Sequence, residues 1–175
     1  MFDGPVNMMK LARIAIEDDR DTFTTRFPYP VLVPSSVQRS KLSDTHEAGS
    51  TLYHLPAVDD AISLYSSPRI LILRRSRQLG PGTTITVGRT TETDLTFSEH
   101  SVSKRHAAFV PVPGKPWKVE DLGSKNGTWI EDLRLLPGVP VEIESAQQVR
   151  FGRVRMHFFL PGDLYTMLNE TTGGG

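Results

Sequence analysis

The chain has 175 residues, which is enough for one ordinary domain with flanking segments but short for two full domains. Its 20 basic residues balance its 20 acidic ones, and this argues against a general nucleic-acid binder, because such proteins are usually basic overall. The absence of cysteine excludes disulfides, thiolate catalysis and cysteine-bound zinc, and it suits a reducing cytoplasm.

The N-terminal residues show neither a membrane span nor a signal peptide. No apolar run in the chain approaches the roughly 20 residues that cross a bilayer. Lys10 and Arg13 interrupt the only apolar stretch near the start, where a signal peptide needs a continuous one. We therefore expect a cytoplasmic protein that does not bind membranes.

Residues 1–67 are predicted to form an N-terminal extension that docks on the following domain, because they hold too little apolar sequence for a separate core. A short polar helix over 17–27 would present Phe23 and Phe27 on one side, four residues apart. The other predicted elements are an extended piece at 29–33, a linker at 34–50 and a short helix within 55–65.

From Pro68 the sequence changes to short apolar or alternating runs separated by turn residues. The predicted strands lie at 70–73, 83–87, 95–97, 107–112, 117–121, 128–130, 139–143, 149–151 and 154–160. Many short strands without a long helical period indicate an all-β fold, an antiparallel β-sandwich or barrel. We predict one domain over 68–160, followed by a flexible tail over 161–175 that ends in three glycines.

Three predicted loops hold polar residues that suit a phosphate group. The first is Gly88-Arg89, directly after a strand, and the second contains Ser103-Lys104-Arg105-His106. The third runs over 121–128 and contains Asn126-Gly127, which alone would be an ordinary hairpin turn. Because loops at one end of a sandwich converge on a ligand, the three together are a candidate binding site.

In this order and on this strand pattern, the three motifs resemble the forkhead-associated (FHA) domain family, over about residues 68–160. The family pattern is Gly-Arg, then Ser-x-x-His, then Asn-Gly. The resemblance implies an antiparallel β-sandwich of about eleven strands that recognises phosphothreonine in partner proteins. It also implies an adaptor in Ser/Thr kinase signalling, not an enzyme, with no cofactor and no bound metal.

The resemblance assigns the phosphate to Arg89, Ser103 and Lys104. A phosphothreonine carries nearly two negative charges and three acceptor oxygens, so a guanidinium, a hydroxyl and an ammonium are suitable partners. Asn126 would hold the peptide main chain through its amide, and Lys125 would add a further phosphate contact. The resemblance makes Gly88, His106 and Gly127 structural supports of the site.

Two other functions stay open. The fold could serve as a phospho-independent scaffold, which need not keep Arg89, Ser103 and Asn126. Alternatively, a phosphorylated threonine of a flanking segment could occupy the site and inhibit it. The candidates for that role are Thr22, Thr24, Thr25, Thr171 and Thr172.

The sequence leaves the target motif undetermined. By the resemblance, the loop 98–101 should help to select the third residue after the phosphothreonine, but Glu99, His100 and Ser101 give it no clear charge preference. A metal pair of His100 and His106 lacks a third ligand. Residues 145–148 depart from the Gly-Asp turn that the family commonly has, so the shape of that loop is not predicted.

Overall fold

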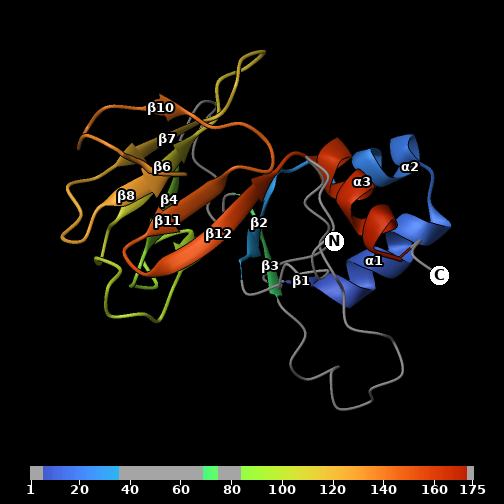
Figure 1. Cartoon of the computed structure of the whole chain (residues 1–175), viewed down its shortest axis with the longest axis horizontal. Helices are drawn as coiled ribbons and strands as arrows, with labels where there is room; N and C mark the ends of the chain where they lie inside the picture. The colour runs from blue at the N-terminus through green and yellow to red at the C-terminus, as the bar shows by residue number, and fades with distance from the viewer. Residues whose placement is uncertain (1–5, 36–68, 75–83, 173–175) are drawn as a thin grey trace, which may run out of the picture.

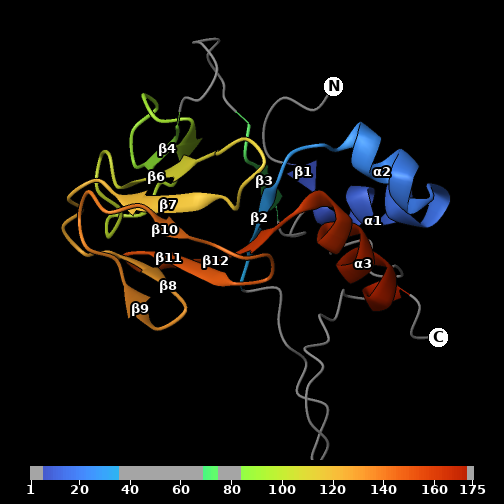
Figure 2. The same ribbon diagram turned by 90° about the horizontal axis from the view of Figure 1, so that it is seen from above.

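A computed structural model describes residues 6–35, 69–74 and 84–172 of the protein. Two β-sheets pack face to face, and a group of three helices lies at one end of them (Figures 1 and 2). The helices are α1 (Met8–Glu17), α2 (Arg20–Arg26) and α3 (Pro161–Thr172). The strands are β1 (Val6–Asn7), β2 (Val31–Pro34), β3 (Arg69–Ile72), β4 (Ile85–Gly88), β5 (Leu95–Thr96), β6 (Ala107–Val110), β7 (Lys118–Asp121), β8 (Thr128–Ile130), β9 (Leu133–Arg134), β10 (Val141–Glu142), β11 (Gln148–Phe151) and β12 (Val154–Phe159).

The larger sheet has seven strands in the order β1-β3-β2-β12-β11-β8-β9, and the smaller has five in the order β10-β7-β6-β4-β5. All paired strands are antiparallel except β4 and β5, which are parallel. The predicted all-β sandwich is therefore confirmed. Strand β2 comes from the predicted N-terminal extension and lies between β3 and β12 in the larger sheet.

Aromatic side chains from both sheets fill the space between them. Phe109 of β6 stacks on Phe158 of β12 with ring centroids 6.1 Å apart, and it meets the edge of Phe151 of β11 at 6.2 Å. All three side chains are fully buried. Burial of each such ring stabilises the fold by about 1.5–3 kcal/mol. This core fixes the strand ends, and the strand ends fix the loops that carry the polar motifs.

The helices close a second apolar cluster beside the sandwich. Asn7 is the N-cap residue of helix α1, and its side chain accepts hydrogen bonds from the N–H groups of Met9 and Lys10. Its buried residues are Met8, Leu11, Ala12 and Ala15, a spacing of three and four that forms one helical face. Phe23 of α2 packs in the same cluster, as do Leu164 and Leu168 of α3.

The structure differs from the sequence predictions in helix α3, in helix α1 and in the short strands β1 and β9. Helix α3 covers most of the predicted flexible tail, because Leu164, Met167 and Leu168 form an apolar face that packs on the N-terminal helices. Helix α1 and strands β1 and β9 were not predicted. The predicted helix within 55–65 and most of the predicted linker at 34–50 lie outside the described residues, and the boundary at residue 67 stays a prediction.

Candidate functional site

Three loops meet at one end of the sandwich, and they are the loops that carry the three polar motifs. The first follows β4, the second joins β5 to β6, and the third joins β7 to β8. The Arg89 N–H donates to the Ser103 carbonyl at 3.0 Å, which joins the first loop to the second. The Lys125 N–H donates to Ser103 Oγ at 3.0 Å, and Asn126 Nδ2 donates to the Ser101 carbonyl at 2.7 Å, so the third loop joins the second.

Gly88 permits the first two loops to approach each other. A Cβ atom at this position would lie 2.1 Å from the carbonyl oxygen of Lys104 and 2.8 Å from Cγ2 of Thr93. Neither distance is compatible with a side chain, and the first contact is to backbone. The glycine before Arg89 is thus required by close backbone packing.

The Arg89 side chain is exposed and is oriented by one hydrogen bond, from its Nε to the carbonyl oxygen of Val102 at 3.1 Å. That bond uses one of the five guanidinium donors. The two Nη groups donate no hydrogen bond to the described residues. They remain available as a fork of donors for an oxyanion.

Ser103 and Lys104 lie on the second loop, and Lys125 and Asn126 lie on the third loop, which hydrogen bonds join to the second. The Ser103 hydroxyl already accepts a hydrogen bond from Lys125, so its own hydrogen is left to donate outward. Lys104 and Lys125 are exposed cations, and Asn126 is exposed although one of its amide hydrogens is bonded to Ser101. Its Oδ1 and second amide hydrogen remain for a ligand.

His106 is buried and binds both neighbouring loops. Its Nδ1 accepts a hydrogen bond from the Ser103 N–H at 3.0 Å, and its Nε2 lies 3.0 Å from the Gly127 carbonyl. These partners fix a neutral ring with its proton on Nε2. Burial lowers the pKa of His106, against the opposing effects of the Gly127 hydrogen bond and the Asp121 charge. Both nitrogens are therefore occupied in holding the loops.

A carboxylate that sequence reasoning did not single out organises the third loop. Asp121 is buried and accepts hydrogen bonds from the N–H groups of Gly123 and Ser124 and from the hydroxyls of Ser124 and Thr128, at 2.6–3.0 Å. Burial raises its pKa, but these four bonds together lower it more. The Asp-x-Gly-Ser spacing is the signal that was available, because an aspartate often bonds the N–H two residues on.

The three loops place their exposed cations at the same end of the sandwich. Arg89, Lys104 and Lys125 each come from a different one of these loops. Over residues 6–35, 69–74 and 84–172, no group of three or more His, Asp or Glu side chains could hold a metal ion. Within the same residues, no helix is long and apolar enough to cross a membrane. The exposed cations of the three loops suit the binding of a small anionic group carried by an extended ligand.

Comparison with known proteins agrees with this geometry. A family model described as FHA domain matches residues 85–152. The chain is 29% identical over 140 residues to the oxoglutarate dehydrogenase inhibitor of Corynebacterium efficiens, a match that covers 77% of this chain and 93% of that protein. It is 43% identical over 58 residues to a protein phosphatase 1 regulatory inhibitor subunit homologue of Arabidopsis thaliana, covering 33% of this chain and only 16% of that protein.

The FHA domain of the CT664 protein from Chlamydia trachomatis is a similar solved structure. It is 25% identical with a TM-score of 0.44, and the match covers 51% of this chain and 83% of that one. The matched stretch of the family model contains all three motifs, Gly88-Arg89, Ser103 to His106 and Asn126-Gly127. The resemblance seen in the sequence is confirmed, because the FHA-domain family model matches the stretch of the chain that carries these motifs.

Proposed function

We propose that this chain is an adaptor that binds a phosphothreonine in a partner protein marked by a Ser/Thr kinase. The observation that carries the proposal is the meeting of three loops through Ser103, whose carbonyl accepts from Arg89 and whose hydroxyl accepts from Lys125. We assign the three cationic side chains and the Ser103 hydroxyl of these loops to one phosphate site. A doubly charged phosphate with three acceptor oxygens is the ligand that such a set fits.

The proposal gives each residue a role. Arg89 binds two phosphate oxygens through its fork, and Ser103 donates its hydroxyl hydrogen to a third. Lys104 and Lys125 add positive charge around the phosphate. Asn126 uses its free Oδ1 and amide hydrogen to hold the main chain of the peptide beside the phosphothreonine.

We also propose that the chain is a binding module and not an enzyme. His106 has both ring nitrogens engaged with Ser103 and Gly127, so it does not serve as a general base. The lack of cysteine suits a reducing compartment, and we propose the cytoplasm as the place of action.

Isothermal titration of the whole chain tests the proposal. The ligands are a degenerate phosphothreonine peptide pool, the same pool with phosphoserine, and the unphosphorylated pool. We expect micromolar binding, about −8 kcal/mol, of the phosphothreonine pool only. Arg89→Ala should abolish it, while Arg13→Ala, which removes an exposed arginine of α1, should leave it unchanged. Equal binding of the unphosphorylated pool would favour a phospho-independent scaffold.

Self-inhibition by a flanking threonine is a separate hypothesis. Thr22, Thr24 and Thr25 lie within helix α2, where the Thr22 N–H is bonded to Asp19 and the Thr24 hydroxyl donates to the Asp21 carbonyl. An FHA site would take a peptide in extended form, so capture of one of these residues requires α2 to unwind. Kinase treatment followed by titration decides: unaltered peptide binding by the phosphorylated chain eliminates this hypothesis.

A further inference from the structure

The outer face of the seven-stranded sheet carries a line of cationic and aromatic side chains. The strand register pairs Arg134 with Trp129 and Trp129 with Arg150. It also pairs Arg150 with Arg155. Directly opposed residues on antiparallel strands project from the same face, so these four form one row across β9, β8, β11 and β12. We call them the arginine row.

The tryptophan holds two of the cations in place. The guanidinium carbon of Arg150 lies 4.2 Å from the centroid of the Trp129 ring, and that of Arg134 lies 5.7 Å from it. Both distances are within the range of cation–π attraction. Arg150 Nη1 also donates to the Gly152 carbonyl at 3.2 Å. Arg134, Trp129 and Arg150 are therefore held together before any ligand binds.

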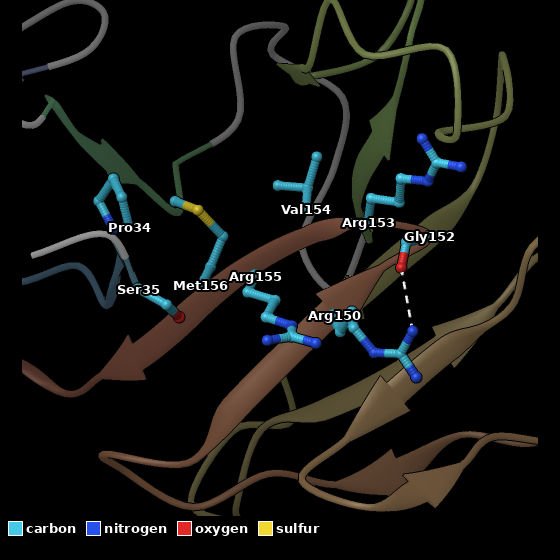
Figure 3. A pocket seen from close by; sticks show the side chains of 8 residues that line it. All are labelled: Pro34, Ser35, Arg150, Gly152, Arg153, Val154, Arg155 and Met156. Atoms are coloured by element: carbon cyan, nitrogen blue, oxygen red, sulfur yellow. Dashed lines mark hydrogen bonds between the residues drawn. The ribbon is translucent and has the colours of Figure 1, made fainter. Parts of the chain in front are cut away.

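The positive charge of the row is not neutralised within the described residues. Neither Arg150 nor Arg155 forms an ion pair with a carboxylate in the part of the chain that the structure describes. Two like charges directly opposite each other destabilise a sheet. Figure 3 shows both side chains on the same side of the β11–β12 ribbon, while Arg153 extends toward the loops. A bound anion would offset the repulsion between the positive charges of Arg150 and Arg155.

Arg153 has an acidic neighbour already. A hydrogen bond from the Ser101 N–H, and to a smaller extent the charge of Arg153, lower the pKa of Glu99. Arg150 and Arg155 thus differ from Arg153, although all three line one pocket of about 610 Å³ (Figure 3). The pocket lies where β2 ends, beside Ser35, whose N–H donates to the Arg155 carbonyl at 3.1 Å.

The row begins next to the proposed phosphothreonine site. A Cβ at Gly127 would lie 2.9 Å from Arg134 Nε and 3.2 Å from Trp129 Nε1, so both side chains pass directly over this glycine. Gly127 follows Asn126 in the chain, and its carbonyl accepts a hydrogen bond from the Gly152 N–H at 3.1 Å. A peptide that leaves Asn126 can therefore continue onto the row.

We propose that the arginine row binds an acidic segment of the same partner whose phosphothreonine binds at the loops. The inference rests on the proposed function, because it places both groups on one peptide. Guanidinium forks match the oxygens of carboxylates and phosphates. The row spans three strand spacings of about 4.8 Å, which is the length of four or five extended residues at about 3.3 Å each. Aspartate, glutamate or a second phosphoresidue would supply the oxyanions.

The test compares peptides that share one phosphothreonine core. One set carries a neutral extension of four glutamines, one carries four glutamates and one carries two phosphoserines, each on either side of the core. The proteins are the wild type, Arg150→Gln/Arg155→Gln, Arg155→Gln alone and the matched control Arg13→Gln. Circular dichroism verifies folding, and Arg155→Gln, which removes an exposed side chain only, serves if the double variant does not fold.

We expect the glutamate extension on one side to tighten wild-type binding about tenfold, which is about 1.4 kcal/mol. The double variant should lose that gain and still bind the neutral peptide as the wild type does, and Arg13→Gln should keep the gain. A larger gain with phosphoserine would assign the row to a second phosphate. No gain with either extension, or a gain that survives in the double variant, would overturn the inference while leaving the phosphothreonine site intact.

A second measurement does not depend on phosphothreonine binding. In a Trp117→Phe variant, Trp129 is the only remaining tryptophan, since the sequence has two. An unphosphorylated glutamate-rich peptide should change its fluorescence, and Arg150→Gln/Arg155→Gln should remove the change. If no phosphopeptide binds but this response is present, the proposed function fails and the anion site stands. Absence of the response, or tighter binding of an RNA oligonucleotide of equal charge, would contradict an acidic peptide as the occupant.

Discussion

The backbone N–H of Lys125 donates a hydrogen bond to Ser103 Oγ at 3.0 Å, and this bond joins two loops that are 22 positions apart in the chain. The bond fixes the Ser103 hydroxyl as an acceptor on one side and directs its hydrogen outward on the other. It also positions the residue directly before Asn126. One side chain therefore both contributes to the proposed phosphate site and sets the distance between two of its loops.

Replacement of Ser103 should remove both contributions. We expect Ser103→Ala to weaken phosphothreonine-peptide binding by at least about tenfold, because a hydrogen bond to a charged group contributes about 1.5–3 kcal/mol. The change in thermal stability should be small by comparison. Titration of the peptide measures the effect, with Thr166→Ala, which removes an exposed hydroxyl of helix α3, as the control. Equal affinities of the two variants would remove Ser103 from the site.

A methyl group at Gly88 should separate the first two loops. Gly88→Ala puts Cβ against the Lys104 carbonyl, so the backbone must shift, and overpacking of this kind costs about 1–3 kcal/mol. We expect a lower unfolding temperature together with weaker peptide binding, because Arg89 is bonded to Ser103 across this contact. In Gly162→Ala the added Cβ meets only the flexible end of Arg20, and its stability should stay within about 1 kcal/mol of the wild type. An unchanged Gly88→Ala protein would contradict the close approach.

Short-range patterns were sufficient to predict most of the sandwich. The run 149–151 and the alternation in 83–87 correspond to strands β11 and β4. A strand buried on one face has alternating apolar residues, and a strand buried on both faces has a continuous apolar run. Strand β9 has two residues, both exposed, and shows neither pattern. Helix α1 was missed although Met8, Leu11, Ala12 and Ala15 have helical spacing, because this stretch was considered only as a signal peptide.

The site residues were visible in the sequence as motifs, but their connections were not. That Ser103 would accept from Lys125, or that Arg89 Nε would donate to Val102, depends on how loops distant in sequence approach each other. The arginine row is hidden for the same reason. Arg134, Arg150 and Arg155 become neighbours only through the register of four strands, which hydrophobic alternation does not determine between distant segments.

Protonation of His106 should make stability depend on pH. Burial holds its pKa below the ordinary value of 6.5 in the folded protein. Below pH 6.5 the His106 ring is protonated in the unfolded chain but stays neutral in the folded protein. Because the unfolded state then binds more protons, stability falls as the pH decreases. We therefore expect the free energy of unfolding to be fully maintained above about pH 7 and to decrease toward pH 5.

Urea unfolding at pH 7.5, 6.5 and 5.5 measures this dependence. His106→Asn keeps an acceptor for the Ser103 N–H but removes the hydrogen bond to the Gly127 carbonyl, which then keeps only the Gly152 N–H as a donor; the loss costs about 0.5–1.5 kcal/mol. This variant should be less stable throughout and should have a shallower pH dependence than the wild type. His100→Asn, at an exposed histidine, should keep the wild-type slope. A slope that persists in His106→Asn would assign it to another group.

Asp121 should be essential for the third loop through its acceptor oxygens more than through its charge. Asp121→Ala leaves two N–H groups and two hydroxyls without their shared acceptor, and we expect it to lower stability by about 2–4 kcal/mol and to abolish peptide binding. Asp121→Asn retains one acceptor oxygen, and the hydroxyls of Ser124 and Thr128 can rotate to accept from its amide, so it should retain part of both properties.

The comparison of these two variants with Asp132→Ala, at an exposed aspartate, separates the causes. Unfolding free energy and peptide affinity should fall in the order Asp132→Ala, Asp121→Asn, Asp121→Ala. Binding depends on this carboxylate indirectly, because the loop that it holds carries Lys125 and Asn126, and neither contacts it in the hydrogen bonds described. If Asp121→Asn were as defective as Asp121→Ala, the negative charge itself would hold the loop, and the hydrogen-bond geometry would be secondary.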